Sequence, residues 1–217
     1  MPGAGSTNPN MAAGEGVRLR DRSVPEVQLS EQLIQVRDRI VAEFDGLEVT
    51  GFRGELTIEF ASEHVIDLLT LCRDDAELSC ELLADLSGVH WPAGQRAELA
   101  QETTGWPQYF SPEQPGRIEL DYLLRSLRHN HAFRLRTYLP DDRPQIATAT
   151  GIYRSANLME REVFDFFGVI FDGHPDLRRI LMPEEWEGHP HRKDYPLGGV
   201  EVQFHGATVP PPDQRSY

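Results

Sequence analysis

Hydrophobic residues recur at helical spacing near the start of the chain. Four of them follow Ser30 at intervals of three or four positions: Leu33, Val36, Ile40 and Phe44. This spacing places them on one face of a helix. Ser30 is the expected N-cap, and Leu29 and Ile34 are placed to form a hydrophobic staple. The helix is predicted to end at Gly46.

A strand and a second helix are predicted next. Leu56, Ile58 and Phe60 alternate with polar residues, as in a half-buried strand. Ser62 is the expected N-cap of the helix that follows. The inner face of this helix is predicted to carry Val65, Ile66, Leu69 and Cys72.

Alternating residues predict three more strands, two of which form a hairpin. The inward residues of the first are Leu82, Ala84 and Leu86. Those of the hairpin are Ile118, Leu120, Tyr122 and Leu124 on one strand and Phe133, Leu135, Thr137 and Leu139 on the other. The turn is expected around residues 129–131. Residues 92–116, which carry Gly and Pro, are predicted to form a long irregular loop.

A third helix and the fold class follow from the next residues. Residues 140–144 close the hairpin, and a short strand at 146–148 leads to a helix with Asn157 as N-cap, Glu160 three residues on and Gly168 at its C-terminus. Its apolar stripe is Met159, Val163, Phe166 and Phe167. The order of elements predicts an α+β fold: a mostly antiparallel sheet with helices packed on one side, plus an extended C-terminal segment.

Composition divides the chain into four parts. Residues 1–24 contain few apolar side chains and are predicted to be a disordered tail. Residues 25–168 form the α+β domain. Residues 169–197 are predicted to be an extended, charged segment that binds a partner, and 198–217 a C-terminal tail.

Charge and cysteine content restrict the possible functions. The 217 residues include 35 acids and 21 bases, a net charge of -14. This balance argues against binding to nucleic acid or to anionic lipid, because both require a cationic face. No run approaches the ~20 apolar residues of a membrane span. Cys72 and Cys80 are the only cysteines, and no secretory leader is recognised, so an intracellular, reduced chain is expected.

The run from Glu160 to Leu197 is dense in charges. Glu162 and Asp165 are like-charged neighbours three positions apart, so their helix does not neutralise itself. Cations further along the run can fold back onto this helix or reach a second chain: Arg178, Arg179, Arg192 and Lys193. The sequence does not separate intramolecular from intersubunit pairing.

Histidines in the same run suggest an alternative, metal-based chemistry. His174, His189 and His191 accompany Asp172, Asp176 and Asp194, all of which are possible metal ligands. Their spacing matches no metal motif, and the two Gly-His-Pro triplets are more typical of rigid turns in which the imidazole bonds to nearby backbone. The sequence has no dinucleotide or phosphate-loop motif, and two cysteines cannot supply the four thiolates of an ordinary iron–sulfur cluster.

The charged run resembles the signature of a known family. The segments 160–162, 165–168 and 173–181 closely resemble the signature of the thirty-kilodalton subunit, also called the C subunit, of respiratory complex I. The similarity continues through 183–196 and extends, more faintly, back to Leu56. Two positions depart from the pattern: Leu158 stands where Trp is usual, and His191 stands where Leu is usual.

The resemblance implies a core subunit, without a cofactor of its own, in the peripheral arm of a proton-translocating NADH:quinone oxidoreductase. Its implied partners are the forty-nine-kilodalton quinone-module subunit, the terminal-cluster subunit and other peripheral-arm subunits. FMN, iron–sulfur clusters, NADH and quinone would belong to the assembled complex. The implied location is the cytoplasmic face of a bacterial membrane, where partner subunits hold the chain.

This resemblance makes the charged run an intersubunit surface instead of an active site, so no catalytic, cofactor-binding or metal residues are expected. The predicted interface residues are Glu160, Arg161, Glu162, Asp165, His174, Asp176, Arg178, Arg179, Trp186, His189, Arg192, Lys193 and Asp194. Arg178, Arg179 and Trp186 are the expected anchors, since binding hot spots favour Arg and Trp. Two alternatives stay open: the same subunit in a related ferredoxin-, deazaflavin- or hydrogenase-linked membrane complex, and a stand-alone metal-dependent hydrolase.

Overall fold

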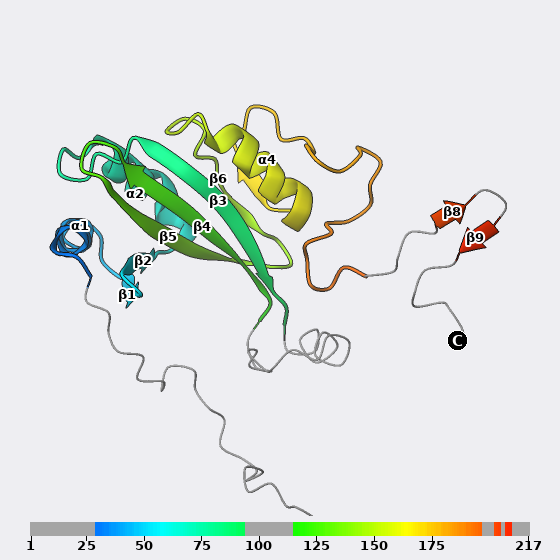
Figure 1. Ribbon diagram of the computed structural model, residues 1–217, viewed down its shortest axis with the longest axis horizontal. Coiled ribbons are helices and arrows are strands. Elements are labelled where there is room, and N and C mark those ends of the chain that lie inside the picture. Colours follow the sequence, from blue (N-terminus) through cyan, green and yellow to red (C-terminus); the bar gives the residue numbers. More distant parts are fainter. Residues whose placement is uncertain (1–28, 94–114, 197–201, 205–206, 210–217) are drawn as a thin grey trace, which may run out of the picture.

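Five strands form the central sheet of the molecule (Figure 1). The computed structural model describes residues 29–93, 115–196, 202–204 and 207–209. The strands are β1 (Glu48–Phe52), β2 (Glu55–Glu59), β3 (Leu82–Trp91), β4 (Arg117–Ser126) and β5 (His131–Pro140). Their order is β1-β2-β5-β4-β3, and every neighbouring pair is antiparallel except β2 and β5, which run parallel.

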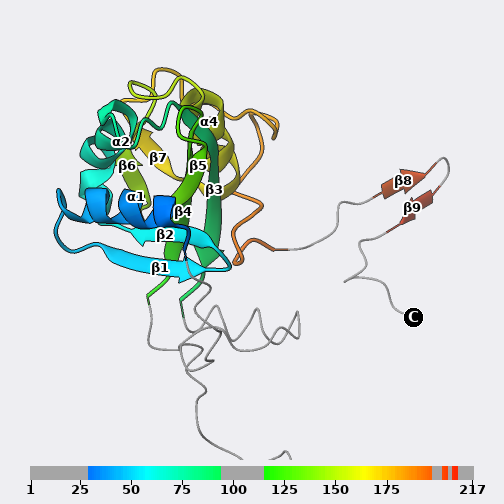
Figure 2. The same cartoon turned by 60° about the vertical axis from the view of Figure 1, so that its left-hand side comes forward.

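Helices cover one side of this sheet, which confirms the predicted α+β class (Figure 2). They are α1 (Glu31–Val41), α2 (Val65–Asp74), which follows a single 3-10 turn η2 (Ser62–His64), and α4 (Ala156–Phe167). Two short pairs complete the described residues: β6 (Gln145–Ala147) with β7 (Ile170–Asp172), and β8 (Val202–Phe204) with β9 (Ala207–Val209). No helix in the described ranges has the length and hydropathy that a membrane span requires.

The hairpin of β4 and β5 supplies the centre of the core, as predicted. The eight residues expected to point inward are all buried: Ile118, Leu120, Tyr122, Leu124, Phe133, Leu135, Thr137 and Leu139. Tyr122 pairs with Leu135 in the register of the two strands. Alternation along each of these strands made the prediction reliable, because successive side chains of a strand point to opposite faces.

Helix α1 starts as predicted but ends early. The Ser30 hydroxyl accepts a hydrogen bond from the Leu33 amide at 3.3 Å, so Ser30 is the N-cap. The helix ends at Val41, before the predicted end at Gly46. Phe44 lies beyond this end, yet its amide still bonds to the Ile40 carbonyl, which is why its spacing matched the helix.

Three sequence predictions near α2 and β3 were wrong. Ser62 does not cap α2; it begins η2, and no side chain caps α2. A β-bulge between Leu83 and Asp85 shifts the register of β3, so Leu83 and Leu86 are buried while Leu82 and Ala84 are exposed. The inner face of α2 is Val65, Leu68, Leu69 and Cys72, while Ile66 is only partly buried.

Strand β1 was not predicted from the sequence. All of its residues are exposed, so it has no inward alternation for a periodicity argument to detect. It forms the edge of the sheet and pairs with β2 alone.

Helix α4 packs on β3 and positions the candidate site. It begins at Ala156 after Ser155, so Asn157 lies inside the helix and the predicted cap was wrong. Gly168 ends it with a φ of 77°, as predicted for a left-handed C-terminal glycine. A Cβ atom added at Gly88 would lie 2.9 Å from the Phe167 ring, so glycine is needed where α4 crosses β3.

Several predictions fall on residues outside the described ranges. They concern the N-terminal tail, most of the loop at 92–116 and most of the C-terminal tail, within which only β8 and β9 are described. The segment predicted to be extended, residues 169–197, includes strand β7 near its start.

Candidate functional site: the strap over helix α4

Residues 173–196 form turns and bends without helix or strand, and we call this segment the strap. Figure 1 shows it in orange, looping along the outer side of α4. The strap carries nine of the thirteen residues predicted for a partner interface, and the other four lie on α4 itself.

Asp165 is the main attachment point between α4 and the strap. Its carboxylate has no exposed surface. One oxygen accepts from Arg179 Nη1 at 2.7 Å. The other accepts from three consecutive strap amides, those of Ile180 at 3.1 Å, Leu181 at 2.8 Å and Met182 at 2.8 Å. One buried carboxylate therefore fixes four residues of the strap.

Arg179 extends this attachment to the next part of the strap. Its Nη2 donates to the carbonyls of Trp186 at 3.0 Å and Gly188 at 2.8 Å. His189 Nδ1 lies 3.0 Å from the Asp165 carbonyl and donates to it. The Arg179 side chain is only 14% exposed, and its guanidinium pairs with Asp165 of the same chain.

Burial and hydrogen bonding have opposite effects on the ionisation of Asp165. Burial alone would raise the pKa of its carboxyl group. The amides of Met182, Leu181 and Ile180, together with the Arg179 guanidinium, outweigh burial and hold the pKa below its usual value. Asp165 is therefore ionised at neutral pH and pairs with Arg179 as a charged group.

Glu160 is a second buried carboxyl group on α4, and it receives fewer hydrogen bonds than Asp165. It accepts from Thr148 Oγ1 at 2.5 Å and from the Ala149 amide at 2.6 Å, which joins α4 to the segment after β6. Burial raises the pKa of Glu160 to about 7, and these two hydrogen bonds only partly oppose the shift.

His174 fixes the start of the strap. Its side chain has no exposed surface. Nδ1 accepts from the Asp176 amide at 3.0 Å, so the proton is on Nε2, which donates to the Asn157 carbonyl at 3.1 Å. Both nitrogens are thus engaged by backbone groups, as predicted for the Gly-His-Pro turns.

A histidine that the sequence did not single out fixes the end of the strap. His90 on β3 is buried, and its Nδ1 accepts from the Lys193 amide at 2.8 Å. Its Nε2 lies 3.3 Å from Asp141 Oδ2. Burial lowers the pKa of His90, although Asp141 opposes this shift. Arg192 also donates to the Asp141 carbonyl at 2.8 Å.

His191 packs against α4 through its ring. Its imidazole stacks on Phe166 with centroids 3.9 Å apart and planes 9° apart, and its amide bonds to the Phe166 carbonyl at 3.1 Å. His191 stands where the family pattern has leucine, and its ring therefore contacts the helix by stacking on an aromatic side chain.

The structure decides the question of charge pairing for several predicted interface residues. Glu160 and Asp165 have no exposed surface, so neither carboxylate can touch a partner directly in this fold. Arg179 and Arg192 bond within the chain. Arg161 is turned toward the strap, where it donates to backbone carbonyls.

Other predicted interface residues keep surface for a partner. The side chain of Arg178 is 65% exposed, and two of its nitrogens donate to Asp176 at 2.6 and 2.7 Å. Glu162, Lys193 and Asp194 are exposed. Trp186 is partly buried, and its indole N–H has no hydrogen-bond partner among the described residues.

The possible metal ligands and the two thiols of the described part of the chain can be compared with the sequence alternatives. No group of three or more His, Cys, Asp or Glu side chains there is arranged to hold a metal ion. The hydrolase alternative needs His174 and His189 as ligands, yet nitrogens of both rings bond to backbone groups. Cys72 and Cys80 are buried free thiols, and burial raises the pKa of Cys80 to about 12.

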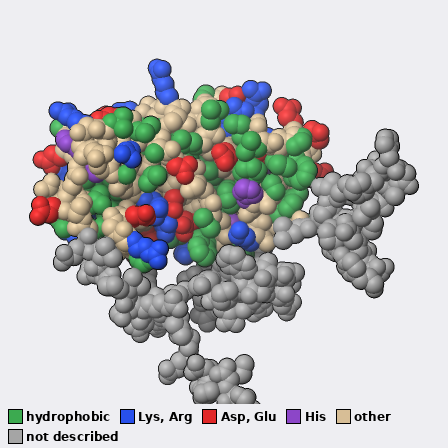
Figure 3. Space-filling model, viewed as in Figure 1, with side chains coloured by type: hydrophobic (Ala, Val, Ile, Leu, Met, Phe, Trp, Pro, Cys, Tyr) green, Lys and Arg blue, Asp and Glu red, His purple; other side chains and the backbone are tan. Residues whose placement is uncertain are grey.

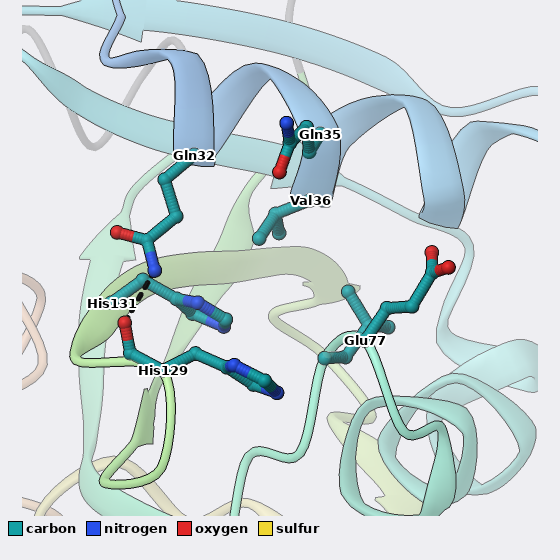
Figure 4. A pocket seen from close by; sticks show the side chains of 7 residues that line it. Gln32, Gln35, Val36, Glu77, His129 and His131 are labelled. Carbon is teal, nitrogen blue, oxygen red and sulfur yellow. Dashed lines mark hydrogen bonds between the residues drawn. The ribbon is translucent and has the colours of Figure 1, made fainter.

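A cavity of about 500 Å³ lies away from the strap, between α1 and the turn of the β4–β5 hairpin (Figure 4). It is lined by Gln32, Gln35, Val36, Glu77, Leu78, His129 and His131. Figure 4 shows the imidazoles of His129 and His131 side by side, with Gln32 reaching down from α1. None of the predicted interface residues lines this cavity.

Comparisons with known proteins agree with the resemblance of the charged run. The family described as "Respiratory-chain NADH dehydrogenase, 30 Kd subunit" matches residues 58–201. The C subunit of NADH-quinone oxidoreductase from Nocardia farcinica (strain IFM 10152) is 42% identical over 168 residues, which are 77% of this chain and 59% of the relative. The protein of that name from Acidothermus cellulolyticus is 42% identical over 186 residues, 83% of this chain and 87% of the relative.

The chain is shorter than several of these relatives. The matched part spans 59% of the length of the Nocardia protein and 64% of that of the Mycolicibacterium gilvum protein.

Two solved structures share the fold. "Nqo5 of the trypsin-resistant fragment (1-134)" superposes with a TM-score of 0.51 and 27% identity, over 67% of this chain and 99% of that chain. A chain of the membrane-bound sulfane sulfur reductase, an archaeal respiratory membrane complex, superposes with a TM-score of 0.58 over 77% of this chain and 87% of that chain. At 22% identity, the second likeness is one of fold alone. The family match and the relatives confirm the resemblance: the chain belongs to the family of the 30 Kd subunit of the respiratory-chain NADH dehydrogenase.

Proposed function

We propose that this chain is a structural subunit of a proton-translocating NADH:quinone oxidoreductase. In this proposal it lies in the peripheral arm and holds the quinone-reducing module together, beside the forty-nine-kilodalton subunit and next to the terminal-cluster subunit. It works by presenting a rigid surface to its neighbours and has no reaction of its own.

The observation that carries the proposal is the way the strap is built. The strap carries most of the family signature, and its side chains His174, Arg179 and His189 bond to its own backbone or to α4. The ionisable groups that could suggest catalysis therefore have structural tasks. The strap is also fixed before any partner arrives, so less conformational entropy is lost on association than an extended peptide would lose.

The electron carriers belong to other subunits in this proposal. FMN, the iron–sulfur clusters, NADH and quinone act in the assembled complex, and this chain contributes no ligand to them. Partner subunits hold it at the cytoplasmic face of a bacterial membrane.

Purification of the intact complex tests the proposal. The full chain carries an affinity tag at its chromosomal locus, and membranes are dissolved in a mild detergent before capture and mass spectrometry. The expected result is stoichiometric recovery of the forty-nine-kilodalton and terminal-cluster subunits, with NADH oxidation by added quinone. A chain recovered alone from the soluble fraction would refute the proposal.

Assays on the same preparation show which of the related complexes contains the chain. Reduced ferredoxin or reduced deazaflavin replaces NADH as electron donor in parallel assays. Turnover with one of these donors, and none with NADH, would assign the chain to a sister complex and leave the structural role intact.

A further inference from the structure

An exposed leucine occupies the most tightly fixed turn of the strap. Leu181 is 59% exposed, and the neighbouring Ile180 is 38% exposed. The amides of both residues are held by the buried carboxylate of Asp165, at 2.8 and 3.1 Å respectively. A single exposed apolar side chain is ordinary on a surface. The feature specific to this turn is that a buried carboxylate also fixes its backbone.

A third exposed aliphatic side chain lies on the side of α4 that the strap follows. Leu158, which is 58% exposed, precedes Arg161 by three positions and Asp165 by seven. This spacing follows one side of a helix. Arg161 donates to the carbonyls of residues 178 and 179 at 3.0 and 3.2 Å, so the strap runs along this side. Figure 3 shows hydrophobic side chains exposed among charged ones on the side of the molecule that carries α4 and the strap.

Exposed carboxylates outnumber cations at the positions that neighbour these three side chains in the sequence. Glu162 on α4 is exposed, as are three strap residues that follow Leu181: Glu184, Glu185 and Glu187. Among the described residues, none of these four carboxylates forms an ion pair within 4.0 Å, and the charge of Glu184 acts on Arg178 from further away. Two cations lie nearby: Arg178 pairs with Asp176, and Arg161 donates to backbone carbonyls of the strap.

We propose that Leu158, Ile180 and Leu181 form a docking patch for a protein surface that offers an apolar cleft bordered by lysine or arginine side chains. The carboxylates around the patch repel an anionic membrane and attract a basic protein surface. The fixed backbone means that the leucine and isoleucine of the strap are already oriented for insertion. The patch rests on the proposed function, in which the basic surface belongs to a neighbouring subunit of the complex.

Exposed leucines elsewhere in the chain supply a matched control. The test variant carries Leu158→Ser and Leu181→Ser, and the control carries Leu127→Ser in the turn of the β4–β5 hairpin, where Leu127 is 65% exposed. Each full-length chain is expressed with a tag in cells that lack the untagged copy. Recovery of neighbouring subunits is measured by quantitative mass spectrometry at increasing salt.

The double variant is expected to retain neighbouring subunits about tenfold less well than the wild type, the loss that one good apolar anchor represents. The control is expected to match the wild type. Reversal of charge by Glu184→Lys with Glu185→Lys is expected to weaken retention and to reduce its dependence on salt. If the serine variant lowers the thermal midpoint of the isolated chain, its poor retention could come from unfolding. The charge-reversal variant removes no apolar contact and then tests the patch independently.

The outcomes separate this inference from the proposed function. If the wild type retains its neighbours and both variants do so equally well, the patch is refuted while the proposed function stands. If the wild type itself retains none of them, the proposed function fails first. Binding of the isolated chain to phosphatidylglycerol vesicles that depends on Leu181 would show that the patch meets lipid, and would overturn the inference.

Discussion

Two buried carboxyl groups on helix α4 differ in how burial and hydrogen bonding balance. Asp165 receives three amide donors and a guanidinium, and its pKa falls below the usual value despite burial. Glu160 receives one amide and one hydroxyl, and its pKa rises to about 7. Burial disfavours both charges; the donors outweigh burial at Asp165 and do not outweigh it at Glu160.

The raised pKa of Glu160 predicts a loss of stability as pH rises. A carboxyl group whose pKa is higher in the folded chain than its unfolded value of 4.5 stabilises fully below that value. The contribution is lost as pH rises through about 7. Glutamine has the shape of glutamate and cannot ionise. The free energy of unfolding of the Glu160→Gln variant should therefore not show this decrease, which is roughly 3 kcal/mol in the wild type.

Urea unfolding at pH 5 and pH 8 measures this effect. Burial lowers the pKa of His90 and of His131, so these two groups reduce stability as pH falls below 6.5. The comparison is therefore the difference between wild type and variant at each pH, in which the histidine contributions cancel. The same difference at both pH values would contradict the assignment.

Asp165→Asn should be the most damaging single change on the outer side of α4. It leaves the largely buried Arg179 guanidinium without its counterion, which costs about 3–5 kcal/mol when a buried pair is broken. Chemical unfolding of the isolated chain measures the loss. Glu162→Gln on the same helix is the control, because exposed substitutions change stability by about 0.5 kcal/mol or less. Equal effects of the two changes would show that the ion pair is unimportant.

At the scale of elements, the contact between α4 and β3 depends on a glycine. The Phe167 ring lies against Gly88, and a methyl group there would approach it to 2.9 Å. A β-bulge just before this point, between Leu83 and Asp85, sets which residues of β3 face the helix. The bulge and the glycine together allow α4 to approach the strand closely.

Gly88→Ala is predicted to destabilise the chain by about 1–3 kcal/mol, the usual cost of overpacking. Phe167→Leu removes ring atoms that the new methyl group would meet, so the double variant should be less damaged than the sum of the two single changes. A double-mutant cycle by thermal or urea unfolding measures this coupling. Additive effects would mean that the two side chains do not compete for space.

At the scale of the whole molecule, the strap belongs to the folded domain. Asp165 holds its middle, His174 its start, and His90 on β3 its end. A segment without helix or strand usually exchanges its amide hydrogens quickly, whereas here several amides donate to buried acceptors.

The amides of Ile180, Leu181 and Met182 should therefore exchange slowly in the isolated chain, although they lie in irregular structure. Hydrogen exchange followed by NMR or mass spectrometry measures this directly. The Asp165→Asn variant should exchange these amides faster, while amides of the β4–β5 hairpin should change little. Rapid exchange in the wild type would show that the strap is ordered only by partners.

Periodicity alone predicted much of the fold. The alternation in β4 and β5, the start of α1 at Ser30 and the glycine after α4 were predicted correctly, because each depends on residues close together in the chain. The family was also accessible from sequence, since its signature lies in one continuous run. The edge strand β1 and the bulge in β3 could not be predicted from the sequence, because neither leaves a periodic pattern of hydrophobic residues.

The tertiary structure alone decided what the charges do. The sequence placed Arg179 and Asp165 in one run, 14 residues apart, but only the path of the strap brings them together and buries the aspartate. His90 lies 103 residues from Lys193, and no local pattern could connect them. Spacing along the chain determines secondary structure, whereas burial and the pairing of distant polar groups depend on how those elements pack.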